Sequence, residues 1–332
     1  MKLDFDPKKN ITKLDYLLMP FTKFGDFLAI KSMVKNWPDV LLFRLGLKKQ
    51  TFTMELRNGI KAKINKPEDY FEFWGTEEGQ MTLFKQACLD KKIEIDRDKK
   101  RINFKFLDRL ISLVYDSTQH LTNTTVMLIK EQFIEEQYGW LDVKGKKVVD
   151  IGANIGDTAI YFALKGAKHV YAFEPYPYSY RIAFRNIKLN RLEDKITVLN
   201  EGCSGKESVI KIDTTYKNTS GTDLKIFSKG KRIKITTLND IVKRFNINHP
   251  AILKIDCEGC EYGVLLKADD SDLRKFKQIQ IEYHYGYLNL EKKLEHAGFK
   301  ISRTTPKHSI NQEAEDKELF IGLIYAGRKR MI

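Results

Sequence analysis

Long apolar runs are missing from the 332-residue sequence, and prolines are few, with eight in the whole chain. A membrane-spanning helix needs roughly 20 consecutive apolar residues, and no segment approaches that length. The first ten residues mix lysine with aspartate, whereas a secretory signal peptide has a basic start followed by an apolar block. We therefore expect a cytoplasmic protein without a transmembrane segment.

Cysteine is also scarce, and the four residues are Cys88, Cys203, Cys257 and Cys260. A disulfide framework in a chain of this length would need many more, and the low count fits a reducing compartment. We therefore expect four thiols. Cys257 and Cys260 form a Cys-x-x-Cys pattern, but the sequence offers neither a second pair nor a nearby histidine to complete a zinc site. Neither a metal nor a redox role is predicted for this pair.

Positive charge is in excess, because 58 Lys and Arg residues stand against 44 Asp and Glu, which gives a net charge of +14. Such a balance attracts polyanions such as RNA or an acidic membrane surface. The basic residues are nevertheless spread along the chain and form no long block. A nucleic-acid partner or a peripheral membrane contact is therefore an alternative and not the leading interpretation. Disorder is excluded, because 42% of the residues are hydrophobic.

The length is about twice that of a typical single domain, so two structural units are expected. Before about residue 130 the pattern is mixed, with helical periodicity over 24–37 and 69–89. Two runs of alternating polarity flank Asn58-Gly59, which predicts a β-hairpin. Residues 1–127 contain no catalytic motif, and we expect them to form an α+β cap or substrate-recognition region.

After about residue 140, short β-branched runs alternate with helical segments, the pattern of a parallel sheet covered by helices on both faces. The predicted fold class is therefore α/β. In such sheets a ligand binds beyond the carboxyl ends of the strands. The predicted strands are 147–151, 169–174, 196–200, 251–256, 278–284 and 319–325.

The first predicted strand leads into a turn with two glycines, Gly152 and Gly156. Asn154 tolerates a left-handed conformation, and Asp157 or Thr158 can cap the helix that follows. A dinucleotide fingerprint needs glycines at 152, 154 and 157, and a phosphate-binding loop needs Gly-Lys-Ser/Thr. Neither pattern is present, so an adenosine ligand without phosphates fits best.

Acidic residues accompany this turn. Asp150 comes two residues before Gly152, and Glu174 ends the second predicted strand. A carboxylate at that place can accept hydrogen bonds from both hydroxyls of a ribose. An adenosine bound in this way points to S-adenosylmethionine. The simpler alternative is a strand-turn-helix in which glycine and asparagine are turn residues only.

Several motifs follow one another in a specific order. They are Val149-Asp-Ile-Gly-Ala-Asn-Ile-Gly-Asp, Phe173-Glu-Pro-Tyr-Pro, Leu253-Lys-Ile-Asp-Cys-Glu-Gly-Cys-Glu and Ile281-Glu-Tyr-His. In these motifs the sequence resembles the FkbM family of S-adenosylmethionine-dependent methyltransferases over about residues 130–305. The resemblance implies a Rossmann-like class I methyltransferase sheet with an antiparallel final strand, formed by residues 128–332. It also implies methyl transfer to a hydroxyl oxygen, with S-adenosyl-L-methionine as cofactor.

The resemblance assigns parts of the cofactor to parts of the chain. The glycine turn would hold the methionine moiety, Glu174 the ribose, and the end of the third strand the adenine. The candidate cofactor-binding residues are Asp150, Gly152, Asn154, Gly156, Asp157, Thr158, Glu174, Pro175, Gly202 and Cys203.

The candidate catalytic residues follow the fourth and fifth strands. Asp256 and Glu258 come where the fourth strand ends, and burying carboxylates there requires a compensating cation such as a sulfonium. Glu282 and His284 share a face at the end of the fifth strand. To remove the proton of an alcohol, we expect His284 as the base, ahead of Asp256 and then Glu258. Glu261 is equally well explained as an acidic residue in the first turn of a helix.

The acceptor atom is expected to be oxygen. Residues 256–260 lack the Asn-Pro-Pro-aromatic signature that holds exocyclic amines in many N-methyltransferases. The resemblance suggests a hydroxyl of a sugar, a glycan intermediate or a small metabolite. The alternatives are an RNA methyltransferase that uses the basic surface and a cofactor-binding module without catalysis. Tyr138 and Glu136 either close over the cofactor or pack in the core.

Overall fold

The computed structural model describes two compact units, one formed within residues 20–135 and the other from residues before 20 together with those from 136 onward. Each is described by itself. The structure describes residues 5–15, 31–44, 47, 50–57, 59–66, 69, 93–96, 98–114, 125–216, 226–311 and 317–328.

The smaller unit contains two antiparallel sheets. Strands β1 (Phe52–Glu55) and β2 (Lys61–Ile64) form a hairpin, which confirms the prediction made from Asn58-Gly59. Helix α3 (Trp37–Arg44) packs on it through the rings of Phe43 and Phe52. The second sheet consists of β3 (Ile93–Asp96), β4 (Arg101–Phe106) and β5 (Arg109–Val114).

A short π-helix, η2 (Lys130–Ile134), closes the second sheet, because Phe133 contacts Phe104 and Phe106. Residues 70–89 of the helix predicted over 69–89 lie outside the described residues, as do residues 24–30 of the one predicted over 24–37. Residues 31–33 are helical, and α3 begins at Trp37.

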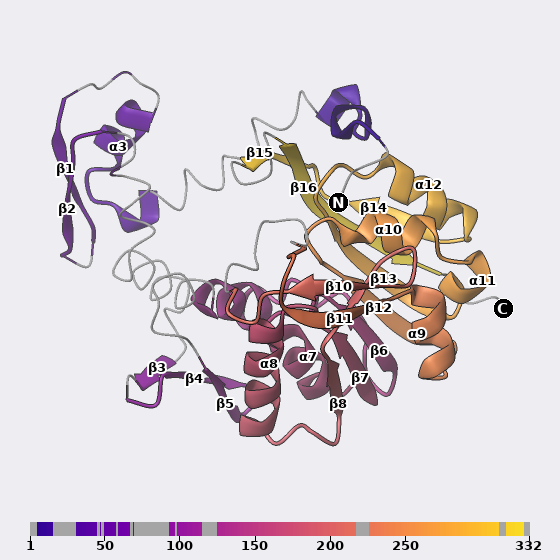
Figure 1. Ribbon diagram of the computed structural model, residues 1–332. Helices are drawn as coiled ribbons and strands as arrows, with labels where there is room; N and C mark the ends of the chain where they lie inside the picture. Colours follow the sequence, from indigo (N-terminus) through magenta and orange to yellow (C-terminus); the bar gives the residue numbers. More distant parts are fainter. Residues whose placement is uncertain are drawn as a thin grey trace. The chain divides into compact units, whose positions relative to one another are not determined.

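The larger unit is built on one mixed sheet, and Figure 1 shows its strands side by side. Five central strands are parallel, and β16 runs antiparallel to its neighbours β13 and β14. In spatial order the strands are β14 (Lys300–Arg303), β16 (Lys317–Gly327), β13 (Phe276–Tyr283), β12 (Ala251–Ile255), β6 (Lys147–Ile151), β7 (His169–Phe173) and β8 (Ile196–Leu199), with β15 (Lys307–Asn311) paired to β16.

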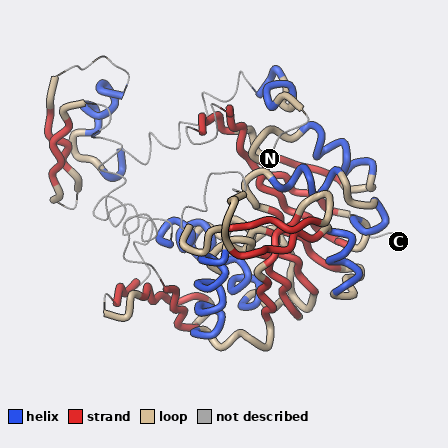
Figure 2. The backbone as a smooth tube through the Cα atoms, viewed as in Figure 1, coloured by secondary structure: helices blue, strands red, loops and turns tan. Residues whose placement is uncertain are grey.

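Helices alternate with these strands, as the coloured tube in Figure 2 makes clear. Helices α7 (Asp157–Leu164) and α8 (Pro177–Leu189) connect β6, β7 and β8. The remaining helices are α9 (Leu238–Arg244), α10 (Cys260–Leu266), α11 (Asp270–Leu273) and α12 (Leu288–His296). Apolar residues of α9, α10 and α12 form one buried core with Val149, Leu253 and Ile279 of the strands.

All six predicted strands are confirmed within about three residues at each end, and the Rossmann-like α/β fold is confirmed with them. Four further strands were not predicted from the sequence. They are β14 and the three strands of a small sheet, β9 (Glu201–Cys203), β10 (Ser208–Ile212) and β11 (Lys231–Thr236). These strands carry many exposed polar residues, so they lack the continuous apolar run by which a buried strand is identified.

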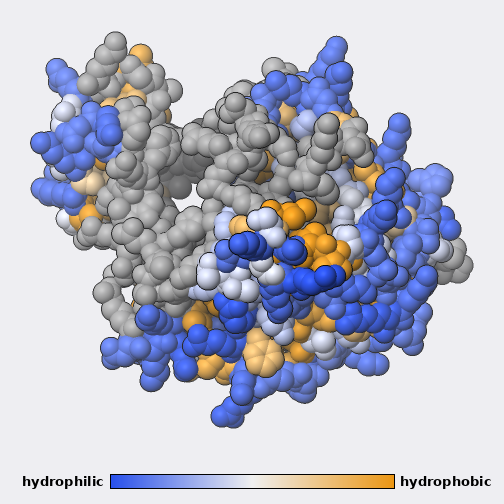
Figure 3. Space-filling view, viewed as in Figure 1, coloured by the Kyte–Doolittle hydropathy of each residue, from blue (hydrophilic) through white to orange (hydrophobic). Residues whose placement is uncertain are grey.

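Exposed apolar and basic side chains lie next to each other on the β10–β11 ribbon. Val209 is exposed on β10, and Lys211, Arg232 and Lys234 are exposed as well. Figure 3 shows strongly hydrophilic and hydrophobic side chains meeting in this region. None of the described helices has both the length and the apolar character needed to cross a membrane.

The described N-terminal segment 5–15 packs on the larger unit. Asn10 Nδ2 donates to the backbone oxygen of Tyr285, and Asn10 O accepts the N–H of Tyr287. The side chain of Tyr287 in turn donates to Asp15. The segment therefore supports the turn that follows His284.

Candidate functional site

The turn between β6 and α7 has three left-handed residues, Gly152, Asn154 and Gly156, with φ angles of 84°, 45° and 83°. The conformation predicted for Asn154 is thus observed. A Cβ atom on Gly152 would lie 1.7 Å from the backbone oxygen of Asp256. Only glycine fits there, and the glycine turn lies directly against the residue that follows β12.

An ion pair lies beneath this turn. Asp150 is fully buried, its Oδ1 is 3.1 Å from Lys254 Nζ, and its Oδ2 accepts the hydroxyl of Thr158 at 2.5 Å. Lys254 Nζ also donates to the oxygen of Gly152 at 2.7 Å. Burial acts to lower the pKa of Lys254, but the charges of Asp150 and Asp256 outweigh it and raise that pKa. Asp150 and Thr158 therefore stabilise the conformation of the glycine turn through these buried contacts.

Glu174 occupies the end of β7 and reaches the glycine turn. Its Oε2 accepts the backbone N–H of Asn154 at 2.9 Å, and its Oε1 accepts that of Tyr176 at 2.8 Å. Burial raises the pKa of this carboxyl to about 8. Each oxygen keeps a further lone pair, so the carboxylate can still accept two hydroxyl groups.

The other predicted cofactor residues differ in their surroundings. Gly202 lies against Pro175, because a Cβ on this glycine would be 3.2 Å from the Pro175 Cβ. Asp157 is buried in the first turn of α7. Cys203 is different, because its side chain belongs to the buried core and burial raises its thiol pKa. Its thiol therefore packs among apolar side chains of the core.

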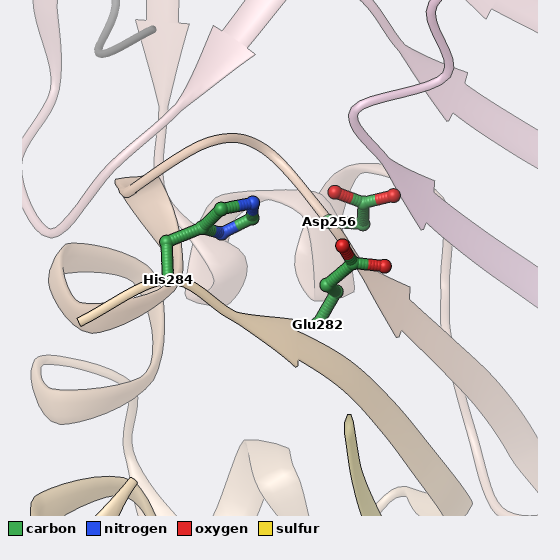
Figure 4. Close-up of side chains that lie close together, drawn as sticks. All are labelled: Asp256, Glu282 and His284. Atoms are coloured by element: carbon green, nitrogen blue, oxygen red, sulfur yellow. The ribbon is translucent and has the colours of Figure 1, made fainter. Parts of the chain in front are cut away.

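The predicted catalytic residues do come together. Ligand atoms of Asp256, Glu282 and His284 all lie within 4.8 Å of one another, and Figure 4 shows the side chains facing a common point. Tyr138 donates its hydroxyl to Asp256 Oδ2 at 3.1 Å, and Gln137 Nε2 donates to Glu282 Oε2 at 2.8 Å. The cluster adjoins the glycine turn through Asp256.

His284 is held between two carboxylates. Its Nε2 lies 3.0 Å from Glu258 Oε2, and its Nδ1 lies 2.8 Å from Glu261 Oε1. Glu261 is fully buried and also accepts the backbone N–H groups of Gly259 and His284. Burial acts to lower the pKa of His284, but the two carboxylates outweigh it and raise the pKa well above its usual value. Both ring nitrogens thus donate, and the ring is an imidazolium.

For Asp256 and Glu282, unlike His284, burial itself raises the pKa. Burial raises the pKa of both carboxyl groups, that of Glu282 to about 8, and the Asp256 charge adds to the effect on Glu282. A carboxylate whose pKa is near neutral is well matched to accept a proton at physiological pH. Glu282 is therefore better suited to take a proton than His284 is, and Asp256 lies beside it.

The expectation that all four cysteines are thiols is wrong for two of them. Cys257 and Cys260 form a disulfide. The backbone between them turns sharply, with Glu258 at φ 57° and Gly259 at φ 112°, and such a turn brings residues three apart together. Among the described cysteines, Cys203 is free.

Sequence reasoning missed part of this site. Lys254 could have been recognised from the sequence, because a lysine inside the apolar run of β12 needs a buried partner of opposite charge. Tyr138, left open between two roles, is buried against Asp256. Glu136 accepts hydrogen bonds from the Tyr161 hydroxyl and Lys165 Nζ, both at 2.8 Å. Nothing in the sequence indicates the role of Gln137, because its hydrogen bond to Glu282 joins residues 145 positions apart.

The sheet order, its antiparallel β16 and the glycine turn after β6 define a class I methyltransferase fold, as the resemblance implied. The family model described as methyltransferase FkbM domain matches residues 150–301, and the resemblance to this family is confirmed over that range. The matched range contains the glycine turn, Glu174 and the cluster of Asp256, Glu282 and His284.

Curated relatives are similar over parts of the chain. Methyltransferase sdnD of Sordaria araneosa is 23% identical over 56% of this chain and 86% of that protein. Hexuronic acid methyltransferase AglP of Haloferax volcanii is 26% identical over 48% of this chain and 62% of that protein. Ribosomal protein L11 methyltransferase of Carboxydothermus hydrogenoformans is 36% identical over 26% of each, so the chain spans about a quarter of its length.

A solved structure with a similar fold is TYW2 of M. jannaschii in complex with AdoMet. It is 17% identical, with a TM-score of 0.36, and the similarity covers 72% of this chain and 90% of that one.

Proposed function

We propose that the protein is an O-methyltransferase that acts on a hydroxyl group of a sugar, a glycan intermediate or a small metabolite. The observation that carries this proposal is the pair of carboxyl groups, Asp256 and Glu282, beside the glycine turn. An alcohol must lose its proton around the transition state, whereas a neutral amine attacks without prior deprotonation. A partly buried carboxyl with a pKa of about 8 suits the first task.

The residues around the glycine turn fit the cofactor. Glu174 can accept both ribose hydroxyls while its bonds to Asn154 and Tyr176 keep it in place. Gly152 and Gly156 allow backbone to approach the methionine moiety, and Pro175 with Gly202 would border the adenine. Asp150 and Thr158 act through the turn rather than by contact, because both are buried below it.

The chemistry assigned to the chain is alignment and proton removal. Bound S-adenosylmethionine supplies an activated methyl group. Asp256 and Glu282 bind the acceptor hydroxyl, align its oxygen and accept its proton, and alignment is the larger contribution to the rate. The imidazolium of His284 keeps Glu258 and Glu261 in place and offsets the negative charge of the cluster. This assignment differs from the order expected from the sequence, in which His284 came first as the base, ahead of Asp256 and Glu258.

The hydroxyl acceptor is supported by two further observations. The cluster contains two carboxyl groups, those of Asp256 and Glu282, and carboxylates bind the vicinal hydroxyls of sugars through paired hydrogen bonds. One curated relative carries the name hexuronic acid methyltransferase. We propose residues 1–127 as the part that recognises the acceptor. The contacts of segment 5–15 with the turn after His284 support this role for that segment, which belongs to the larger unit.

An RNA acceptor is the second candidate, and the β10–β11 ribbon favours it. Lys211, Arg232 and Lys234 are exposed on this ribbon, where phosphate groups could bind them. RNA affinity that falls steeply with salt concentration would support this candidate.

The experiment is methyl transfer from a labelled donor to saccharide, metabolite and RNA fractions of a cell extract. The proposal expects label in a carbohydrate or small-molecule fraction, as an alkali-stable methyl ether. Glu282→Gln is the matched inactive control, with S-adenosylhomocysteine binding checked by calorimetry. Label in RNA alone, or tight cofactor binding without transfer to any fraction, would contradict it.

A further inference from the structure

The disulfide between Cys257 and Cys260 lies within the catalytic cluster itself. Cys257 directly follows Asp256, and the loop that the disulfide closes contains only Glu258 and Gly259. Both cysteines are half-buried, so a small reductant can reach them from solvent. The cross-link therefore joins the two sides of a turn whose side chains line the proposed acceptor site.

The turn has an unfavourable backbone conformation. Glu258 and Gly259 both have left-handed φ angles, of 57° and 112°. Glycine adopts this region without penalty, but a glutamate does so at a cost in free energy and needs support from its surroundings. A covalent bond between the residues on either side removes many of the alternative conformations that would relieve this strain.

The conformation of the turn decides where two carboxylates lie. Glu258 is inside the loop and places Oε2 3.0 Å from His284 Nε2. Glu261 directly follows the loop, accepts the N–H of Gly259 inside it, and lies 2.8 Å from His284 Nδ1. The disulfide thus ties together the two groups that hold the imidazolium from opposite sides.

The two carboxylates do not depend on the cross-link equally. Glu261 is fully buried and has partners in the backbone of both strand ends, so other contacts also hold it. The side chain of Glu258 is 26% exposed, so it is less enclosed by the surrounding protein. Release of the turn would therefore move Glu258 more than Glu261.

We propose that the Cys257–Cys260 disulfide is a redox-sensitive positioning element that holds Glu258 against His284, and that its reduction by a dithiol lowers turnover. The step is balanced: two electrons and two protons pass from the dithiol to the two sulfur atoms, the S–S bond breaks, two thiols form, and the dithiol becomes a disulfide. The consequence for turnover rests on the proposed function, whereas the consequence for His284 does not.

The test compares the oxidised full-length chain with the same chain after reduction by dithiothreitol. Alkylation under denaturing conditions, followed by mass measurement, gives the redox state, because reduction of the disulfide adds two thiols that can be alkylated. The main readout is the NMR titration of the His284 ring, assigned from the spectrum of His284→Gln. The charged groups that face this ring are Glu258, Glu261, Asp256 and Glu282.

Reduction is expected to shift the His284 titration to lower pH, by about one to three units, because the ring loses one of its two carboxylate partners. Turnover on the acceptor is expected to fall about tenfold to a hundredfold, since misplacement of a positioning group costs this much. S-adenosylhomocysteine affinity should stay unchanged within error, which shows that the fold survives reduction.

Variants separate the disulfide from other thiols. Cys257→Ser with Cys260→Ser should reproduce the reduced titration and no longer respond to dithiothreitol. Glu258→Gln should lower the His284 titration in both redox states and abolish the difference between them. Cys88→Ser is the matched control and should keep the full response.

An unchanged His284 titration in a fully reduced chain would overturn the proposal, and so would higher turnover after reduction. If the chain transfers no methyl group in either state, the His284 titration still decides the matter. A shift on reduction then supports the positioning element while the proposed function fails.

Discussion

Asp150 and Lys254 are direct partners across the centre of the sheet, on strands 104 residues apart. The register of β6 and β12 places the two residues opposite each other, and their charged atoms are 3.1 Å apart. Neither side chain is exposed by more than 1%. A lysine and an aspartate buried in this way depend on each other, because either one alone would leave an uncompensated charge in the core.

Lys254→Met is therefore expected to destabilise the protein by about 3–5 kcal/mol, because Asp150 would remain buried without a cation. Chemical unfolding followed by circular dichroism measures this change. Lys168→Met, at an exposed position, is the control and should have little effect. Adding Asp150→Asn to Lys254→Met should recover part of the loss, and a double variant as unstable as the sum of the single ones would show that the pair is not coupled.

Glu174→Gln should weaken the binding of S-adenosylhomocysteine about tenfold to a hundredfold, because an NH₂ group replaces one of the two acceptor oxygens and a buried polar group left without its hydrogen-bond partner costs about 1–3 kcal/mol. The amide nitrogen would also face a backbone N–H of Asn154 or Tyr176. Isothermal calorimetry is the measurement. Glu207→Gln, at an exposed position just before β10, is the matched control. Equal affinities of the two variants would place the ribose elsewhere.

Glu282→Gln should lower turnover about a hundredfold to ten-thousandfold if the carboxyl accepts the proton of the hydroxyl. Cofactor affinity should change little, because Glu282 bonds to Gln137 and not to the glycine turn. His284→Gln should also reduce turnover, through the positions of Glu258 and Glu261, and again with little effect on cofactor affinity. Single-turnover kinetics with saturating cofactor would reveal the effect. Full activity of Glu282→Gln would leave Asp256 as the base.

Folding stability should fall as the pH rises from about 5 to 8. Glu174 and Glu282 have folded-state pKa values raised to about 8, so the folded protein keeps two protons that the unfolded chain loses above about pH 4.5. His284 acts in the same direction, because its raised folded-state pKa contributes stability that is complete below about pH 6.5 and is lost as the pH rises through the folded value.

Thermal melting across this pH range tests the prediction, and Glu282→Gln should flatten the dependence. Stability that rises over the same interval would contradict it.

Methyl transfer should be insensitive to a metal chelator. Asp256, Glu282 and His284 are residue types that bind divalent cations, and they lie close enough to do so. Both nitrogens of His284 are, however, engaged by carboxylates, so the ring is charged and presents no lone pair to a metal. Assays with and without EDTA, after dialysis, measure this. Activity that is lost with the chelator and restored by one cation would show a metal site.

Much of the larger unit follows from local patterns. The apolar runs of β6 and β12 identify buried strands because each alone contains enough hydrophobic residues to define its element. Gly152 and Asn154 indicate the left-handed turn because few residue types adopt that backbone. Residues near strand ends could be predicted to meet, since parallel strands bring their carboxyl ends to one edge. Asp256, Glu282 and His284 do meet there.

The electrostatics of the cluster could not be predicted in the same way. His284 was expected to be the base because histidine ordinarily titrates near neutral pH. Its two carboxylate partners come from the turn after β12, 23 and 26 residues earlier, and only the assembled sheet brings them to its ring nitrogens. The disulfide was missed for a related reason, since composition suggests a compartment but not the conformation of one turn.

The sequence by itself determined the strands and helices of the catalytic unit, the glycine turn and the family, because these depend on residues near one another in the chain. Only the tertiary structure decided which charges are neighbours: Lys254 with Asp150, His284 with Glu258 and Glu261, and Tyr138 with Asp256. The physical reason is that the protonation state of a buried group depends on the charges within a few ångströms of it. Those distances are set by strand register and packing between distant segments.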